Sequence, residues 1–389
     1  MVDDLTIKIC GDNMKILTRI LFKTKILGCF ATTLILLIGC DQSIQTISLE
    51  TILPTTSKSQ TAPIAITQSP NQNRISNLLT IPSDCYVKDI SPDVKWIAMS
   101  CPSGEKNELR LQKIGERVYE TIMVDEQFDA IFSPDGKKLV VEQSLGKDIL
   151  LFTVGDWSTP FTLVPKRDVE IGLYWSPDSQ HLAATYLEKG QALSILDLDG
   201  KYVNLLTYNE VNREPGSEDY FGPSWSPDSV YIVYVITPTY NEPQPLQLWT
   251  INADTKEKKL IYAGKQDEIG INPIWSPSGD YISVEGALTD PEFKLYIFNV
   301  NSNNYSLLIS TSRPANLYAW APDGKQITIC DSIGELSVVS LQTGKKTLIY
   351  PNCGIFVKWV DEKRIIFETP GTYYNDFSYD YINVVTLSQ

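Results

Sequence analysis

Short runs of alternating apolar and polar residues follow one another from residue 74 onward, separated by polar turns rich in Pro, Asp, Gly and Ser. Between Leu173 and Tyr186, an apolar run enters Trp175-Ser-Pro-Asp-Ser and a second alternating run leaves it. Pro presets φ at the first corner of such a turn, and Asp accepts hydrogen bonds from nearby backbone amides. The pattern predicts a β-hairpin whose large residue before Ser packs between neighbouring hairpins.

This hairpin unit occurs seven times. The copies begin at Ile90, Phe132, Trp175, Trp225, Trp275, Trp320 and Trp359, at intervals of 42, 43, 50, 50, 45 and 39 residues. A period of roughly 45 residues with β-type flanks is typical of a propeller, in which each repeat forms one four-stranded blade. We therefore expect an all-β fold, a seven-bladed β-propeller of antiparallel blades, with a six-bladed ring as the alternative.

Two further strands are expected after each hairpin. Third strands are predicted at Leu109–Lys113, Ile149–Val154, Leu193–Leu198, Leu246–Ile251, Lys294–Val300, Glu335–Leu341 and Tyr381–Leu387. Fourth strands are predicted at Val118–Met123, Phe161–Val164, Tyr202–Thr207, Lys259–Tyr262, Tyr305–Ile309 and Lys346–Tyr350. The seventh blade has no fourth strand after its third, and Ile75–Ile81 resembles the other fourth strands. We expect this N-terminal segment to close the ring, which leaves no free sheet edge there.

The repeated phrase, an aromatic residue followed by Ser-Pro-Asp-Gly, resembles the repeat of TolB-type, WD-like β-propellers. The same repeat occurs in the propeller part of prolyl-oligopeptidase-like enzymes. The resemblance covers residues 74–389 and implies the propeller fold. We expect no room for the α/β domain that precedes the TolB propeller, and the Gly-x-Ser-x-Gly of the oligopeptidase hydrolase domain is absent from the sequence. The resemblance therefore implies neither a Tol-system role nor peptidase activity.

The N-terminal segment of the chain has the composition of an export signal. A basic segment, Met14–Lys25, precedes the apolar run Ile26–Ile38 and then Gly39-Cys40. This order is typical of a secretory signal, and the run is shorter than the ~20 residues of a membrane span. Leu37-Ile-Gly-Cys40 also resembles the bacterial lipobox, which implies cleavage before Cys40 and its lipidation. A plain signal peptide is the alternative.

Three segments follow from this interpretation. Residues 1–39 are the signal peptide, with Met14 as the expected start because acidic Asp3, Asp4 and Asp12 are unusual in such a peptide. Residues 40–73, rich in Ser, Thr, Pro and Gln, are expected to be a flexible tether because they cannot bury a core. Residues 74–389 form the propeller. The protein is thus expected to be exported and lipid-anchored to a bacterial membrane, on its periplasmic or cell-surface side.

The charge balance narrows the class of partner. The chain has 33 Lys and Arg against 47 Asp and Glu, a net charge of −14. This balance excludes nucleic acid and anionic headgroups as expected partners and favours a protein or peptide with a basic patch. We expect a monomeric propeller.

Four cysteines lie in the propeller, namely Cys85, Cys101, Cys330 and Cys353. An exported protein permits disulfides. Cys85 and Cys101 should lie opposite each other across the first hairpin, and Cys330 and Cys353 should lie at the same end of the ring. Pairs 85–101 and 330–353 are favoured, with buried free thiols as the alternative, because sequence does not fix connectivity.

The sequence contains few residues that would support a catalytic function. The only histidine, His181, lies beside a hairpin turn, and one histidine cannot form a His-rich metal site. Asp197-x-Asp199-Gly200 lacks the remaining ligands of a calcium loop and is interpreted as a turn. We predict no catalytic residue, cofactor or metal, although a carboxylate pair facing the channel would support a propeller hydrolase or lyase.

Nearly all insertions are expected on one face of the ring, the face of the second-to-third loops and the blade-to-blade links. They are Asn209–Pro223, Thr237–Pro245, Ala287–Glu292 and Thr369–Asp380. Loops on one side of a rigid ring commonly carry function, and their aromatic and acidic residues suit a binding surface. The candidate partner-binding residues are Glu218, Asp219, Tyr220, Phe221, Tyr240, Glu242, Tyr373, Tyr374, Asp376, Phe377 and Tyr379. The leading hypothesis is a protein- or peptide-binding scaffold. A glycan- or cell-wall-binding lipoprotein is the alternative, and the aromatics could also fold back to cover the ring.

Overall fold

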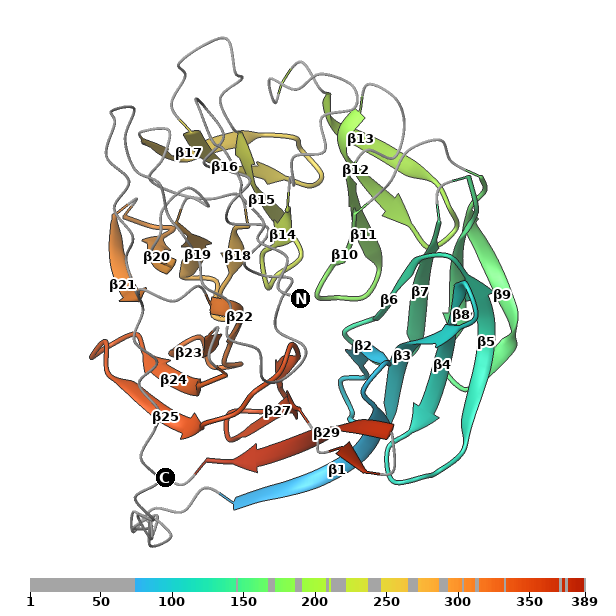
Figure 1. Cartoon of the computed structure of the whole chain (residues 1–389). Coiled ribbons are helices and arrows are strands. Elements are labelled where there is room, and N and C mark those ends of the chain that lie inside the picture. The colour runs from blue at the N-terminus through green and yellow to red at the C-terminus, as the bar shows by residue number, and fades with distance from the viewer. Residues whose placement is uncertain are drawn as a thin grey trace, which may run out of the picture. The chain divides into compact units, whose positions relative to one another are not determined.

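A computed structural model describes residues 74–144, 146–166, 172–185, 191–207, 210, 222–236, 246–264, 272–286, 293–302, 304–311, 315–331, 334–370, 373–374 and 377–387. All of them belong to the second of the two compact units of the chain, Gln68–Gln389. These residues form seven antiparallel sheets arranged around a centre, which confirms the predicted seven-bladed β-propeller (Figure 1).

Each of the first six blades uses four strands in chain order. Blades one to three are β2 (Tyr86–Ile90), β3 (Trp96–Ser103), β4 (Lys106–Lys113) and β5 (Tyr119–Asp125); β6 (Phe128–Phe132), β7 (Lys138–Gln143), β8 (Ile149–Thr153) and β9 (Asp156–Val164); and β10 (Gly172–Trp175), β11 (His181–Thr185), β12 (Gln191–Asp197) and β13 (Tyr202–Thr207). Blades four to six are β14 (Ser224–Trp225), β15 (Tyr231–Ile236), β16 (Leu246–Asn252) and β17 (Lys258–Gly264); β18 (Ile274–Trp275), β19 (Tyr281–Glu285), β20 (Phe293–Asn299) and β21 (Tyr305–Thr311); and β22 (Ala315–Trp320), β23 (Gln326–Asp331), β24 (Leu336–Ser340) and β25 (Lys346–Tyr350). In every one of them, the first strand lies nearest the centre of the ring.

The seventh blade is built from both ends of the propeller. Its order is β26 (Val357–Trp359), β27 (Arg364–Thr369), β29 (Phe377–Thr386) and β1 (Arg74–Pro82), and β28 (Tyr373–Tyr374) pairs with β29. Strand β1 pairs antiparallel with β29 from Arg74↔Thr386 to Pro82↔Tyr379. The predicted closure by an N-terminal strand is confirmed.

The second strand of each blade is buried on both faces, because a neighbouring blade covers each side of it. In β15, for example, four consecutive residues from Ile232 to Val235 are buried. The apolar clusters cross from blade to blade, as where Val233 and Leu248 of blade four meet Trp275 and Val284 of blade five. A strand that is buried on both faces has a continuous run of apolar residues in its sequence. The second strands of the seven blades resemble one another for this reason.

The repeated serine organises each hairpin turn. In the third copy, the Ser176 hydroxyl donates to the Asp178 carboxylate at 2.6 Å and accepts the backbone N–H of His181 at 2.9 Å. Asp178 in turn accepts the backbone N–H of Gln180 at 3.0 Å, as its predicted role requires. Five of the copies repeat the acceptor role of this serine. The phrase is therefore a self-contained turn that fixes where each blade begins.

The tryptophan before this serine joins neighbouring blades, as predicted. The indole N–H of Trp225 donates to the Tyr174 carbonyl of the preceding blade at 3.0 Å. Trp175 and Trp359 make the corresponding bonds to Ile131 and Ala319. Each of these three indoles thus both fills the space between blades and donates to a carbonyl of the previous blade.

Both predicted disulfides are present. Cys85 is bonded to Cys101 within blade one, and Cys330 of β23 is bonded to Cys353, which precedes β26. The first bond fixes the start of blade one directly after β1, and the second links blade six to blade seven. The two bonds therefore flank the blade that closes the ring.

Candidate functional site

Most of the predicted partner-binding residues lie outside the described residues. These are Glu218, Asp219, Tyr220, Phe221, Tyr240, Glu242 and Asp376. The lipidation candidate Cys40 also lies outside the described residues. The described remainder, Tyr373, Tyr374, Phe377 and Tyr379, lies in blade seven.

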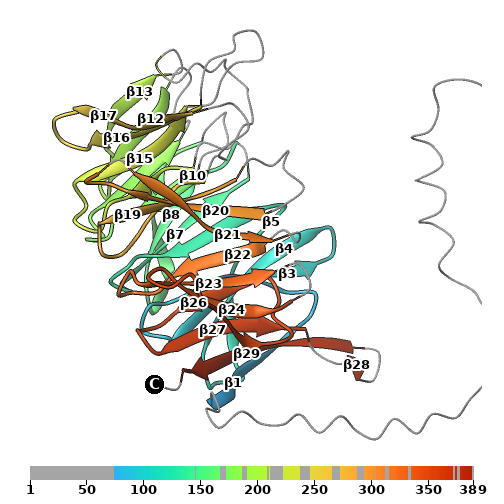
Figure 2. The same ribbon diagram turned by 90° about the vertical axis from the view of Figure 1, so that its left-hand side faces the viewer.

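These four aromatics belong to a β-hairpin. The insertion between residues 369 and 380, expected as a loop, forms β28 and the first part of β29, with Tyr373↔Ser378 and Tyr374↔Phe377 in register. The reason is that alternating aromatic and polar residues here suit a strand. Strand β27 ends its pairing at Thr369↔Tyr381, so the hairpin continues past the blade (Figure 2). The sequence and the backbone thus place several aromatics on one projecting element.

A buried carboxyl group lies at the base of this hairpin. Glu368, the second-last residue of β27, is 5% exposed, and its Oε2 accepts the backbone N–H of Ile355 at 3.3 Å. Burial and the nearby carboxylate of Asp380 raise the pKa of Glu368 above its ordinary value, against that hydrogen bond. Gly354 leaves room for this side chain, since a Cβ there would come within 3.1 Å of the Glu368 Cγ. Sequence reasoning missed Glu368, although an acid near the end of an apolar strand is a visible signal.

A second such acid ends β19 in blade five. Burial raises the pKa of the Glu285 carboxyl. Burial and then the charge of Glu285 raise the pKa of Tyr318 in β22, whose hydroxyl donates to the Asn272 carbonyl at 3.4 Å. Ser283 also donates to the Tyr318 hydroxyl and accepts the indole N–H of Trp320 at 2.8 Å. Glu368 and the half-buried Glu285 therefore lie at or next to the ends of second strands, at the face where the long insertions begin.

Charged residues of the innermost strands meet where the ring closes. Lys358 of β26 lies 2.7 Å from Oδ1 of Asp89 in β2. Asp89 Oδ2 also accepts the backbone N–H of Phe132 in blade two at 2.9 Å. Next to it, Lys88 lies 3.6 Å from Asp129 of β6. One carboxylate therefore connects blades seven, one and two, so these charges are used in holding the ring together.

The other sequence candidates for chemistry lie in ordinary turns. His181 begins β11 and pairs with Asp197 across the sheet. Asp197 accepts the backbone N–H groups of Asp199 and Lys201 at 3.0 and 2.8 Å, which is the expected turn. Gly200 is required there because it has φ +82° and a Cβ would lie 2.5 Å from the Leu163 carbonyl oxygen. Within the described ranges, no group of three His, Cys, Asp or Glu residues is placed to hold a metal.

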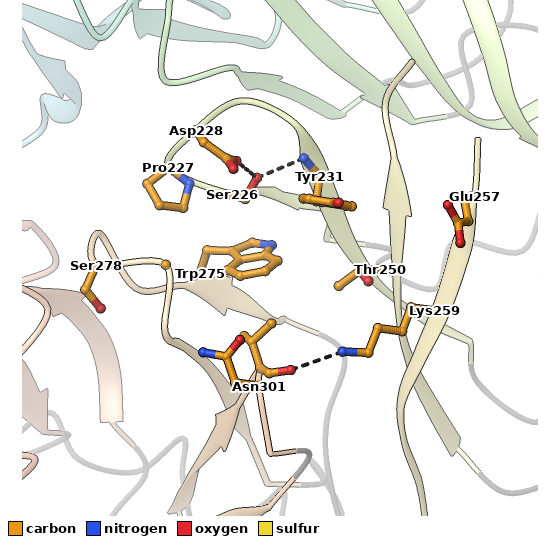
Figure 3. Close-up of a pocket in the computed structure, with 12 residues that line it drawn as sticks. Ser226, Pro227, Asp228, Tyr231, Thr250, Glu257, Lys259, Trp275, Ser278 and Asn301 are labelled. Atoms are coloured by element: carbon orange, nitrogen blue, oxygen red, sulfur yellow. Dashed lines mark hydrogen bonds between the residues drawn. The ribbon is translucent and has the colours of Figure 1, made fainter. Parts of the chain in front are cut away.

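A cavity lies on the opposite face, between blades four and five (Figure 3). Its volume is about 440 Å³, and hairpin turns of both blades form its wall. The lining includes Tyr231, Glu257, Lys259, Trp275 and Asn301. Sequence reasoning placed function on the other face and did not predict this cavity.

No helix of the described residues is both long and apolar enough to span a membrane.

Solved structures share the fold at low sequence identity. A manganese complex of an oligogalacturonate lyase has a TM-score of 0.58 and 13% identity, over 82% of this chain and 99% of that one. A chain of a mitotic checkpoint complex has a TM-score of 0.53 and 14% identity, over 85% and 98%. A putative TolB from Agrobacterium tumefaciens has a TM-score of 0.43 and 14% identity, over 70% and 95%.

The two likenesses with TM-scores of 0.58 and 0.53 show the β-propeller fold alone. No protein-family model and no curated protein sequence matches the chain. An oligogalacturonate lyase and a mitotic checkpoint complex have unrelated roles, so function must be argued from the surfaces of this chain.

Proposed function

We propose that this protein is an exported lipoprotein, tethered to a membrane through Cys40, that binds a protein or peptide on the insertion-bearing face of its propeller. The observation that carries the proposal is that the described strands end and resume on one face of the ring wherever the sequence has a long insertion, and that one insertion forms the projecting β28–β29 hairpin. Four of the aromatic candidates lie on that hairpin. Tyr and Phe supply contact area at a small cost in side-chain entropy, which favours their use at protein interfaces.

Export is supported by chemistry in the propeller. Two disulfides are formed there. Disulfides persist in oxidising compartments and are rare in reducing ones. This agrees with the signal-like segment before Cys40 and with a role outside the cytoplasm.

The partner is expected to carry a basic patch. The chain has 47 acidic against 33 basic residues, and Glu218, Asp219, Glu242 and Asp376 are all in the insertions. Complementary charge would speed association and make it sensitive to salt. A scaffold role also suits a propeller in which the one histidine and the inner charged residues serve turns and blade contacts.

The proposal is tested by pull-down and crosslinking from membranes of the native host. The test variant replaces Tyr220, Tyr240, Tyr373 and Tyr374 by Ala. The control variant replaces Tyr119, Tyr202 and Tyr305, which are 46%, 39% and 41% exposed on the outer strands, by Ala. A partner captured by the wild type and the control, and lost from the test variant, supports the proposal. Equal capture by all three proteins assigns binding to another surface.

The lipid anchor is tested separately. Cys40→Ser is expected to move the protein from the membrane fraction to the soluble exported fraction and to abolish labelling by a palmitate analogue. Unchanged membrane association of the variant would contradict anchoring through Cys40.

A further inference from the structure

The fifth copy of the repeat differs from copies three and four at two adjacent positions. Copies three and four read Ser-Pro-Asp-Ser, whereas the fifth reads Ser-Pro-Ser278-Gly279. In copies three and four, the last serine has a left-handed backbone, with φ of +62° at Ser179 and +59° at Ser229. Its hydroxyl reaches the preceding blade, where Ser229 accepts the backbone N–H of Asp178 at 3.0 Å.

Gly279 cannot make this contact with blade four, because it has no side chain. Ser278 has a hydroxyl where copies three and four have the larger carboxylate of an aspartate, and this hydroxyl lies 3.1 Å from that of Ser276. A Cβ on Gly279 would come within 3.3 Å of the Pro227 Cγ, so a side chain there would enter the space between the two turns. The cavity of about 440 Å³ lies here, with Pro227, Ser278 and Gly279 in its wall.

An unsatisfied donor lies in the same wall. The indole N–H of Trp275 is buried and has no hydrogen-bond acceptor among the described residues, although the indole of Trp225 donates to a carbonyl of the preceding blade. The Trp275 side chain occupies the middle of the lining residues in Figure 3, and the residue as a whole is only 8% exposed. A buried donor without a partner costs the folded protein free energy.

The rest of the lining mixes aromatic surface with donors and acceptors. Tyr231 is 40% exposed, and Asn301, Glu257 and Lys259 are also exposed. The Lys259 ammonium donates to the Val300 carbonyl at 3.2 Å, which holds it at the cavity. The acids Asp228 and Glu257 in the lining outnumber this one cation, so an anionic ligand such as a phosphate is disfavoured.

We propose that this cavity binds a neutral mono- or disaccharide. Sugar hydroxyls both donate and accept, so they match the exposed carboxylates, amide and ammonium of this lining. The apolar faces of a sugar ring would pack against Trp275 or Tyr231. The volume lies within the range of about 300–1,000 Å³ of small-molecule sites. This site is separate from the partner-binding face proposed above and does not depend on it.

Gly279→Ser is the decisive variant, because it restores the residue that copies three and four carry at the same turn position. Serine adopts the required backbone in those copies, so the variant is expected to fold. Gly136→Ser is the matched control, since Gly136 occupies the same corner of copy two and a Cβ there would lie 3.7 Å from Pro92, an ordinary contact.

Binding is measured by saturation-transfer NMR and calorimetry with glucose, maltose, N-acetylglucosamine and its β-1,4-linked dimer as probes. We expect at least one probe to bind the wild type and Gly136→Ser equally, and to bind Gly279→Ser at least tenfold more weakly. Asn301→Ala, a change at an exposed side chain, is expected to weaken the same probe several-fold. Absence of binding by all four sugars, or unchanged affinity in Gly279→Ser, would overturn the proposal. Capture of the membrane partner should be equal in all these variants.

Discussion

The Lys358 ammonium of the last blade lies 2.7 Å from the Asp89 carboxylate of the first. Because the two side chains are 33% and 13% exposed, removing the cation leaves a largely buried carboxylate. Lys358→Met is expected to lower the free energy of unfolding by about 1.5–3 kcal/mol. Urea unfolding measures this value. Lys137→Met, which breaks the exposed pair with Asp135, is the control and should change stability by less than about 1 kcal/mol. Equal effects of the two variants would contradict a special role for the closing pair.

Substitutions at Ser179 distinguish the contribution of a hydrogen bond from that of backbone strain. Its hydroxyl accepts the backbone N–H of Asp135 in the preceding blade at 3.0 Å, while its φ is +62°. Ser179→Ala keeps the left-handed backbone and loses the bond, so it should destabilise the protein by about 1 kcal/mol. Ser179→Gly loses the same bond but relieves the backbone, and should lie close to the wild type. Thermal or urea unfolding of the two variants measures their stabilities. An alanine variant as stable as the glycine variant would contradict the prediction.

Two tryptophans of similar burial differ in their hydrogen bonds. Trp225 is 6% exposed and donates to the Tyr174 carbonyl, whereas Trp275 is 8% exposed and has no acceptor among the described residues. Trp→Phe removes the same atoms at both positions. We expect Trp225→Phe to be more destabilising than Trp275→Phe by about 1 kcal/mol, because only the former removes a hydrogen bond formed by the indole. Denaturant unfolding of the two variants measures the difference, provided that their m-values are equal. Equal losses of unfolding free energy in the two variants would contradict the prediction.

Glu368 predicts an unusual pH dependence. Burial and the charge of Asp380 raise its pKa in the folded protein above the ordinary glutamate value of 4.5. The folded state therefore holds this proton more tightly than the unfolded state, and stability falls as pH rises from about 4.5 through the raised pKa. Glu368→Gln should be more stable than the wild type at pH 7, and the difference should vanish below about pH 4.5.

The control for this change is Glu120→Gln on the exposed part of β5. It should follow the wild type at every pH in a series of urea titrations. A Glu368→Gln variant that is less stable than the wild type at pH 7 would show that the carboxylate is needed in its charged form.

The repeat made most of the fold predictable. In the third copy, for example, the serine and aspartate bond within their own hairpin, so a local phrase is enough to locate the turn. Closure by the N-terminal strand followed from counting strands, and the disulfide pairs followed from their positions in blades one, six and seven. These features depend on residues close in the sequence or on a regular period.

The missed features depend on neighbouring blades. Gly279 is visible in the sequence, but the cavity beside it exists because blade four offers nothing that fills the gap. At Gly324, the same residue type is packed closely, since a Cβ there would lie 2.8 Å from Ser278. Glu368 is likewise buried by chain from outside its own strand, at Gly354 and Ile355. The β28–β29 hairpin was missed because its turn follows no repeat of the phrase.

Closure of the ring by β1 has a consequence for how the chain folds. Strand β1 is synthesised first among the strands of the propeller, yet its partner β29 is synthesised last. Contacts between distant parts of a chain form late and slowly, because a long loop must be ordered before they repay its entropy. Until β29 is available, blade seven cannot form and β1 stays an unpaired strand exposed to misassociation. A protein exported through a membrane would therefore complete its fold only after the whole propeller has crossed.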